Sequence, residues 1–307
     1  METNKIILKE LIKRGYTEKN GSNMWNIRDS KLWYLNNKQA QAFLDLKSSE
    51  TYVNGIIIKE VKLIDDNIKE ILETIGDNIN IVDIASRDGR KANRILKHLT
   101  AKKNIKYYPV DTHKFMTDKA IQKIQNLNVV ESSEAIIVES FLKIENIGDN
   151  LTYPKTVFLL LGNNLGNFEI NEMLYEARKI MKDEDLLIIG NGIDNENDKE
   201  SLKAYTSKQI NDFFIEIPKQ LGFSEEDLEF GLKYENSRVQ IFYTIKNNFT
   251  IKEKKDTIEF KKGDQIRVCS SAKYPKNDFN SFLNLYFTQV DVNISEDKSY
   301  ALAICKK

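Results

Sequence analysis

Cysteine and histidine are scarce in this sequence of 307 residues, which has two of each. Cys269 and Cys305 are too few for a disulfide-stapled fold or for a zinc site built from cysteines. With only His98 and His113, histidine-rich metal chemistry and a histidine-based catalytic triad are disfavoured. We therefore expect no bound metal, and any catalysis has to use carboxylates, tyrosines, asparagines or an organic cofactor.

Charge of one sign and long apolar runs are also lacking. The 46 lysines and arginines balance 46 aspartates and glutamates, whereas proteins that coat nucleic acid or an anionic membrane need a basic excess. The strongest apolar runs, residues 157–161 and 186–189, are far shorter than a membrane span. Residues 1–14 lack the apolar core of a signal peptide. These absences predict a cytoplasmic protein with free thiols that binds neither nucleic acid nor membrane, and they leave its oligomeric state open.

The residues that are present suffice for a sizeable core and show a changing periodicity. Hydrophobic residues make up 41% of the chain, and the length allows one large domain or two smaller ones. Residues 55–75 carry apolar residues such as Ile58 at helical spacing and predict one amphipathic helix. Between residues 79 and 190 short apolar runs alternate with helical stretches, which predicts an α/β sheet covered on both faces. Elsewhere we expect a turn at 15–26, helices at 199–232, an antiparallel meander of four strands at 239–270 and a closing hairpin at 289–306.

A strand, a tight turn and a helix are predicted for residues 81–91 (IVDIASRDGRK), and the next strand ends at Asp111. Nucleotide-binding βαβ units have this form, because the turn lets the backbone approach the ligand and the acid binds the two ribose hydroxyls. An ordinary turn followed by a solvated aspartate explains the same residues equally well.

A polar loop follows the strongest predicted strand, within residues 157–168 (VFLLLGNNLGNF). Ligands of doubly wound sheets bind where the strand order reverses, next to the first strand. The loop is therefore a natural place for a substrate to meet a cofactor. We expect at least one of Asn163, Asn164 and Asn167 to be functional. The alternative is that all three only form the turn, because asparagine tolerates left-handed turn geometry.

Six segments, taken in order, resemble the histidine-specific S-adenosylmethionine methyltransferases, whose best-known members make the trimethyl betaine of histidine on the ergothioneine route. The segments are 81–91, 108–111 (YPVD), 140–141 (SF), 158–168, 192–194 (GID) and 271–274 (SAKY). The likeness covers residues 30–307 of this chain. Its most specific part is 161–168 (LGNNLGNF), which is similar to the family's LGSTIGN.

The resemblance implies that S-adenosylmethionine is the cofactor, and it assigns the contacts. Asp111 would bind the ribose, and Lys91 would meet the carboxylate of the methionine part. Ser140 and Phe141 would hold the adenine, with Ser140 in place of the family's usual aspartate. The remaining cofactor-binding positions would be Ala85, Ser86, Arg87, Gly89 and Gly162.

The resemblance also implies an amino-acid substrate. Asn167 would hydrogen-bond its α-amino and carboxylate groups, and Tyr34 and Tyr52 would contact it from two further segments similar to the family. Tyr205 would grip the carboxylate, and Ser271 would meet the side-chain end. Tyr34 and Asn167 are the expected catalytic residues. Each tyrosine could instead be a packed aromatic whose hydroxyl is satisfied within the fold.

Three departures from the family pattern matter. The family's Gly-Ser-Gly turn reads Ala85-Ser86-Arg87; alanine costs little if its φ is negative, and Arg87 could point to solvent, bind the cofactor or obstruct it. Cys269 stands where histidine-specific members carry a glutamate that grips the imidazole. A thiol is a poor partner for an imidazole N–H, so we do not expect histidine as the preferred substrate, and Cys269 is either a small apolar wall or a reactive thiol. Residues 1–30 have no counterpart in the family pattern.

We therefore predict a class I methyltransferase domain with a Rossmann-like α/β sheet, made of residues 56–194 and 277–307. A substrate-binding or lid domain of α+β type would contain residues 1–55 and 195–276. The expected reaction is methyl transfer to an amino group of a small amino acid or amine, which needs orientation more than acid–base groups. The alternatives are a non-catalytic relative that acts as a binding or partner subunit, and a methyltransferase that acts on a protein N-terminus or another macromolecule.

Overall fold

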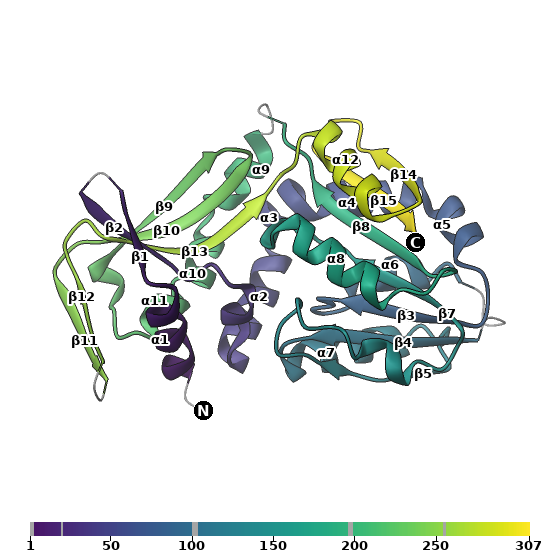
Figure 1. The fold of residues 1–307 in the computed structure, drawn as a ribbon, viewed down its shortest axis with the longest axis horizontal. Coiled ribbons are helices and arrows are strands. Elements are labelled where there is room, and N and C mark those ends of the chain that lie inside the picture. Colours follow the sequence, from purple (N-terminus) through teal and green to yellow (C-terminus); the bar gives the residue numbers. More distant parts are fainter. Residues whose placement is uncertain (1–2, 20, 100–103, 196–198, 254–255) are drawn as a thin grey trace. The chain divides into compact units, whose positions relative to one another are not determined.

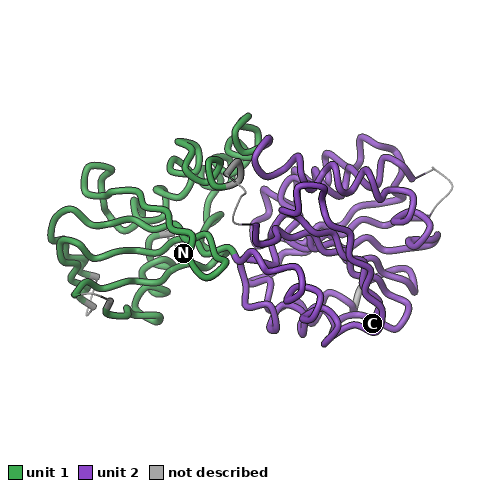
Figure 2. The backbone as a smooth tube through the Cα atoms, turned by 90° about the horizontal axis from the view of Figure 1, so that it is seen from above, with its two compact units in different colours: residues 1–52, 202–271 green, residues 53–201, 272–307 purple. Residues whose placement is uncertain are grey.

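The computed structural model describes residues 3–19, 21–99, 104–195, 199–253 and 256–307. Two compact units are present, each assembled from two separate stretches of the chain (Figure 2). Unit 1 contains residues 1–52 and 202–271, and unit 2 contains residues 53–201 and 272–307. The sequence placed these junctions a few residues away, at 55/56, 194/195 and 276/277.

Unit 2 is built on a mixed sheet (Figure 1). Its strands are β3 Ile79–Ile84, β4 Ile105–Asp111, β5 Ser132–Ser133, β6 Ile136–Ile137, β7 Lys155–Leu160, β8 Leu186–Gly192, β14 Gln289–Ile294 and β15 Tyr300–Lys306. They lie in the order β14-β15-β8-β7-β3-β4-β5, with β6 also paired to β4. The pairs from β8 to β5 are parallel, whereas β15 is antiparallel to both β8 and β14. The expected closing hairpin is the pair β14–β15.

Helices cover both faces of this sheet because its strands are apolar on both sides. In β3, Ile79 and Ile81 pack with residues of α4 to α7, while Val82 and Ile84 pack with residues of α8 and α12. Such continuous burial is typical of parallel strands, and the predicted α/β sheet is confirmed. The helices are η2 Val53–Ile57, α4 Ile58–Asp66, α5 Ile68–Ile75, α6 Arg90–Leu96, α7 Lys114–Gln125, η3 Ile147–Asn150, η4 Leu165–Asn167, α8 Ile170–Ile180 and α12 Lys276–Tyr286.

The strand order reverses at β3, which has β4 on one side and β7 on the other. The next strand along the chain after β3 is β4, whereas β7 and β8 extend the sheet in the other direction. Because these strands are parallel, the loops that follow β3, β4 and β7 leave the sheet at the same edge. A doubly wound sheet binds its ligands at this point.

The single helix predicted for residues 55–75 is wrong. The π-helix η2 leads into α4, which ends at Asp66, and α5 begins two residues later. Asn67 interrupts the helix with a φ of −107°. Its side-chain Nδ2 donates to the Leu63 carbonyl oxygen at 2.8 Å and so competes with the helical bond from its own backbone N–H to the same oxygen, which is 3.3 Å long. The apolar face also differs from the expected one, because Ile58 is 50% exposed and Glu60 is 1% exposed.

Unit 1 is of α+β type (Figure 1). Its five-stranded sheet contains β1 Tyr16–Lys19, β2 Ser22–Asn26, β9 Leu228–Glu235, β10 Arg238–Ile245 and β13 Gln265–Ala272, in the order β1-β2-β13-β10-β9. The strands β11 Phe249–Glu253 and β12 Asp256–Phe260 form a separate hairpin. The helices are α1 Thr3–Arg14, η1 Ser30–Tyr34, α2 Asn37–Ser48, α3 Glu50–Tyr52, α9 Lys199–Tyr205, α10 Lys208–Phe214, α11 Glu216–Lys219 and η5 Glu225–Asp227.

Three predictions for unit 1 are wrong. Residues 16–19 and 22–26 form the antiparallel pair β1–β2 instead of a turn, and the stretch read as helical to residue 232 already contains β9 from Leu228. The four-strand meander splits, because β11 and β12 pair only with each other. The physical reason is long-range pairing: β2 lies parallel to β13, with Met24 opposite Gln265. A polar strand held by such a distant partner has no local signature, since strand preference depends strongly on context.

The described residues contain neither a membrane-spanning helix nor a metal-binding cluster of side chains. No helix in those ranges has both the length and the apolar character needed to cross a membrane. Nor do the side chains of those ranges bring together three or more His, Cys, Asp or Glu that could hold a metal ion.

Candidate cofactor and substrate site

The turn that follows β3 holds three residues in left-handed backbone geometry. Ala85, Arg87 and Gly89 have φ values of 58°, 53° and 68°. Gly89 precedes α6, and a Cβ there would come within 3.0 Å of the Ala120 Cα, which explains the glycine. Alanine would cost little at this position only if its φ were negative, and the φ of Ala85 is positive. A residue with a side chain in this region costs on the order of 1 kcal/mol.

The Arg87 side chain folds onto the end of β4 and does not point to solvent. Its backbone N–H donates to Asp111 Oδ2 at 3.0 Å, and its Nη1 lies 3.3 Å from both carboxylate oxygens. Its Nη2 donates to Asn164 Oδ1 at 3.3 Å, and its Cζ lies 5.3 Å from the centroid of the Phe141 ring, in a cation–π contact. Arg87 is 5% exposed and Asp111 is fully buried, so this is a buried ion pair.

Lys91 is paired with a buried carboxylate that the sequence did not predict. Its Nζ forms an ion pair with Oε2 of Glu60, which comes from α4. The Oε1 of Glu60 accepts a hydrogen bond from the Gly162 N–H at 2.7 Å. One carboxylate therefore links two of the positions expected at the cofactor. Glu60 lies three residues after Ile57 and four residues before Ile64, so helical spacing places it on the buried face of the helix. A charged residue at such a position was the signal in the sequence.

The loop after β7 is held together by its own asparagines. Asn163 has a φ of 59°, donates its N–H to the Gly190 carbonyl oxygen at 3.3 Å and accepts a hydrogen bond on Oδ1 from the Gly192 N–H. Asn164 Nδ2 donates to the Leu161 carbonyl oxygen. Asn163 and Asn164 are thus used within the fold. The Asn167 side chain is partly exposed, and no described residue hydrogen-bonds its amide.

The adenine-site candidates follow β6. Phe141 is 1% exposed and meets the Phe168 ring edge-on, with the centroids 6.2 Å apart. Ser140 is half-buried, and its Oγ accepts a hydrogen bond from the Leu142 N–H at 3.3 Å. In the turn after β3, the buried Oγ of Ser86 has no hydrogen-bond partner among the described residues.

These residues fit the donor set that S-adenosylmethionine requires. The set comprises the buried carboxylate of Asp111 at the end of β4, the aromatic ring of Phe141 after β6, the unpartnered hydroxyl of Ser86 in the turn after β3 and the ammonium of Lys91 in the first turn of α6. These segments follow the strands at the reversal of strand order. Arg87 already contacts Asp111 and Phe141, the two groups that would meet the ribose and the adenine.

The three predicted substrate tyrosines belong to unit 1. Tyr34 ends η1 and is 1% exposed, and its ring packs against Phe43 and Phe213 with centroids 5.1 and 6.1 Å away. Tyr52 ends α3 and is half-buried, whereas Tyr205 ends α9 and is buried. The structure brings Tyr34 into an aromatic cluster, and each tyrosine terminates a helix.

Cys269 and Ser271 lie two residues apart on β13, so their side chains point to the same face of the sheet. Both are buried. Burial raises the pKa of the Cys269 thiol to about 12. The thiol is therefore protonated near neutral pH, which favours the small apolar wall over the reactive thiol because the thiolate is the nucleophile.

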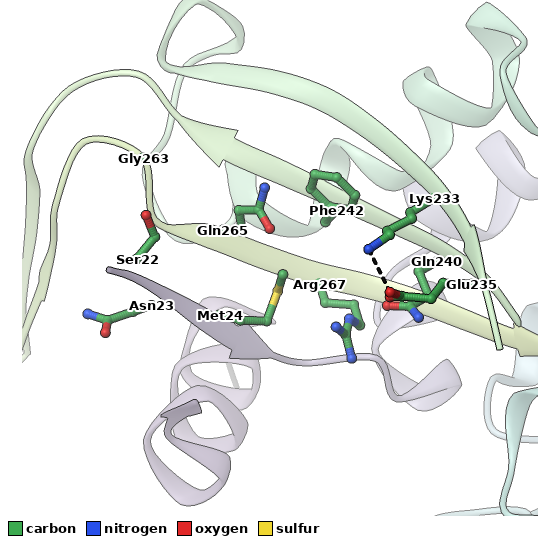
Figure 3. Close-up of a pocket in the computed structure, with 10 residues that line it drawn as sticks. All are labelled: Ser22, Asn23, Met24, Lys233, Glu235, Gln240, Phe242, Gly263, Gln265 and Arg267. Atoms are coloured by element: carbon green, nitrogen blue, oxygen red, sulfur yellow. Dashed lines mark ion pairs between the residues drawn. The ribbon is translucent and has the colours of Figure 1, made fainter. Parts of the chain in front are cut away.

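A cavity of about 310 Å³ lies elsewhere on unit 1, over β2, β13 and β10 (Figure 3). Lys233 and Glu235 form an ion pair of 2.9 Å at its edge. Its lining also includes the Phe242 ring and Arg267, whose buried Nε has no hydrogen-bond partner among the described residues. None of the predicted site residues lines this cavity.

The strand order, the antiparallel β15 and the acid that ends β4 define a class I methyltransferase fold with a Rossmann-like sheet. Residues 33–307 match the family described as "Histidine-specific methyltransferase, SAM-dependent". The chain belongs to this family, whose cofactor is S-adenosylmethionine (SAM).

Among individual proteins, the chain is similar to the N-methyltransferase fsqC of Aspergillus fumigatus, with 24% identity over 246 residues. The match covers 75% of this chain and 66% of the fungal protein, so the chain spans slightly less than two thirds of that relative. A possible exported protein from Bordetella parapertussis has a TM-score of 0.50 and 8% identity, covering 99% of this chain and 87% of that one. An O-methyltransferase family protein from Burkholderia thailandensis has a TM-score of 0.48 and 11% identity, covering 99% and 68%. At these identities a structural likeness concerns the fold alone.

Proposed function

We propose that this chain transfers a methyl group from S-adenosylmethionine to an amino nitrogen of a small amino acid or amine, and that histidine is not its preferred substrate. The observation that carries the proposal is the convergence of Asp111, Phe141 and Lys91 at the reversal of strand order, in a chain of this family. The name of the fungal relative, an N-methyltransferase, supports nitrogen as the acceptor atom.

The cofactor would be held by unit 2. Asp111 would accept hydrogen bonds from the ribose hydroxyls, and Phe141 would pack on the adenine with Ser140 beside it. Lys91, whose charge is balanced by Glu60, would attract the carboxylate of the methionine part. The Ser86 hydroxyl, which has no partner among the described residues, is a further donor. When bound, S-adenosylmethionine supplies an electrophilic methyl group on a sulfonium.

The amino group of the substrate would be oriented by Asn167 and Tyr34. The Asn167 amide is partly exposed and makes no side-chain hydrogen bond to described residues, so both its donors and its acceptor suit a ligand. A carbonyl oxygen and a tyrosine hydroxyl accept hydrogen bonds from a neutral amine and so favour the form that carries a lone pair. Holding this nitrogen in line with the methyl group reduces the entropic part of the barrier.

The substrate class follows from unit 1, which we propose to be the substrate-binding domain. Tyr52 and Tyr205 would hold the common amino-acid groups, and Ser271 would meet the side chain. Cys269, buried and with its pKa raised to about 12, offers no charge and only a weak acceptor where the family's glutamate binds an imidazole. A pocket that lacks this buried acceptor favours a more apolar or differently shaped side chain than that of histidine.

A screen of free amino acids and small amines tests this proposal. The full chain is incubated with S-adenosylmethionine and each candidate, and release of S-adenosylhomocysteine is measured. We expect turnover on at least one amine, a loss of turnover in Asn167→Ala, and higher turnover on histidine in Cys269→Glu than in the wild type. Strong turnover of histidine by the wild type would contradict the argument from Cys269, and no turnover on any amine would contradict the amino-group assignment.

The second candidate is a non-catalytic relative that acts as a binding or partner subunit. The observation that favours it is Arg87, whose guanidinium contacts the groups that would hold the cofactor. A chain of this kind would not bind S-adenosylmethionine in calorimetric titration at millimolar concentration, whereas the enzyme would.

A further inference from the structure

The carboxylate proposed to bind the ribose has its acceptor positions filled by the chain itself. Asp111 Oδ1 accepts from the Thr112 N–H at 2.8 Å and from Arg87 Nη1 at 3.3 Å. Its Oδ2 accepts from the Arg87 backbone N–H at 3.0 Å and from the same Nη1 at 3.3 Å. A carboxylate offers about four acceptor positions, so two ribose hydroxyls can bind to it only if the Arg87 side chain leaves.

The same guanidinium also covers the proposed adenine contact. Its Cζ lies 5.3 Å from the Phe141 ring centroid, and its Nη2 donates to Asn164 Oδ1 at 3.3 Å. Arg87 therefore bridges the end of β4, the segment after β6 and the loop after β7. These contacts hold a backbone with a φ of 53°, a conformation that persists in a non-glycine residue only when its surroundings impose it.

We propose that Arg87 is an internal plug of the cofactor site, which occupies the ribose and adenine positions in the free protein and swings out when S-adenosylmethionine binds. The inference rests on the proposed function, because the site is taken to be a S-adenosylmethionine site. Arg87 would control access to the cofactor site and would not take part in the methyl transfer.

The plug makes the cofactor affinity depend on how often the site is open. The apparent dissociation constant equals the intrinsic one divided by the open fraction, so a plug closed for about 90% of the time weakens binding roughly tenfold. Removing the side chain should recover this factor. The Arg87→Gly and Arg87→Ala variants should gain alike, because both delete the guanidinium, although only glycine also relieves the left-handed backbone.

Calorimetric titration of the full chain with S-adenosylmethionine tests the plug. We expect Arg87→Ala and Arg87→Gly to bind about tenfold more tightly than the wild type, or more. The matched control is Arg90→Ala, three residues away in the first turn of α6, where the side chain pairs with Asp88. The control should bind S-adenosylmethionine as the wild type does.

Removing Arg87 leaves Asp111 buried without its counter-ion, which could unfold the Arg87→Ala and Arg87→Gly variants. Two further measurements keep the test decisive in that case. Arg87→Gln keeps a donor for Asp111 without the charge, and it should also bind more tightly. Thermal unfolding with and without S-adenosylmethionine should show a larger rise in Tm for the Arg87 variants than for the wild type.

The outcomes separate the plug from the proposed function. Tighter binding by the Arg87 variants than by a wild type that itself binds supports the plug. If the variants bind and the wild type does not, the plug is overturned, because the Arg87 side chain then does not leave for the cofactor, and the non-catalytic relative is favoured. If the wild type binds and the Arg87 variants bind equally or more weakly, the plug is overturned and the methyltransferase proposal stands. If neither the wild type nor any variant binds, the S-adenosylmethionine site itself is refuted, and the plug with it.

Discussion

Removal of the Glu60 carboxylate should destabilise unit 2 strongly. In Glu60→Ala, Lys91 loses its counter-ion at a position where its side chain is only 14% exposed, and the Gly162 N–H loses an acceptor at 2.7 Å. Breaking a buried ion pair by removing one partner costs about 3–5 kcal/mol. An orphaned buried donor costs about 1–3 kcal/mol on its own. Because the two effects share one carboxylate they do not simply add, and we expect a total loss of about 3–5 kcal/mol in the free energy of unfolding.

Two related variants divide this loss between charge and hydrogen bond. Glu60→Gln keeps an acceptor for the Gly162 N–H and should lose less than Glu60→Ala. Lys91→Met leaves the Glu60 carboxylate buried without a counter-ion and should also be destabilising. Combined with Glu60→Gln, it should cost less than the sum of the two single changes, by about 0.5–3 kcal/mol, because the partners are in direct contact.

Urea unfolding followed by far-UV circular dichroism is the appropriate assay for these variants. The chain has two tryptophans, Trp25 and Trp33, and both lie in unit 1, so tryptophan fluorescence reports on the wrong unit. The matched control is Glu296→Ala, whose ion pair with Lys62 is exposed on both sides and should not measurably change the midpoint. A loss below about 0.5 kcal/mol in Glu60→Ala would refute the buried pair, because that is the range of ordinary surface substitutions.

Three further predictions concern local features. Ala85→Gly should stabilise the chain by about 1 kcal/mol in urea unfolding because it relieves a φ of 58°, and a destabilised variant would contradict this. Burial lowers the pKa of His113 below its ordinary 6.5, although the negative charge of Asp111 acts in the opposite direction. As the pH falls, the unfolded chain therefore binds a proton at this histidine before the folded chain does. The free energy of unfolding should fall as pH drops from 6.5 towards the lower, folded-state pKa. His113 caps α7 by accepting a hydrogen bond on Nδ1 from the Phe115 N–H at 3.3 Å; His113→Asn keeps such an acceptor and should lose this part of the pH dependence. Cys269 and Cys305 are buried with raised pKa values, so a thiol reagent at pH 8 should label neither in the native chain and both in denaturant.

The central sheet is the part of the fold that the sequence predicts best. Parallel strands are buried on both faces and therefore read as continuous apolar runs, which is how residues 157–161 and 186–189 indicated β7 and β8. The turn after β3 and Asp111 were found for the same reason, because each directly follows such a run. Helix spacing was less informative, since Asn67 divides the stretch predicted as one helix.

Side-chain directions depend on distant partners and could not be predicted. The sequence allowed three directions for Arg87, and the choice is made by Asp111 and Asn164, which lie 24 and 77 residues further along the chain. Glu60 is a similar case, because its partners Lys91 and Gly162 come from other elements. The polar strand β2 was missed since its partner β13 lies far away in sequence.

The most direct test of the account is a calorimetric titration of the wild-type chain and of Asp111→Ala with S-adenosylmethionine. Asp111 is buried at the end of β4 and is the group proposed to hold the ribose. We expect saturable binding to the wild type and its loss in Asp111→Ala. No binding to the wild type at millimolar cofactor, or unchanged affinity in the variant, would contradict it.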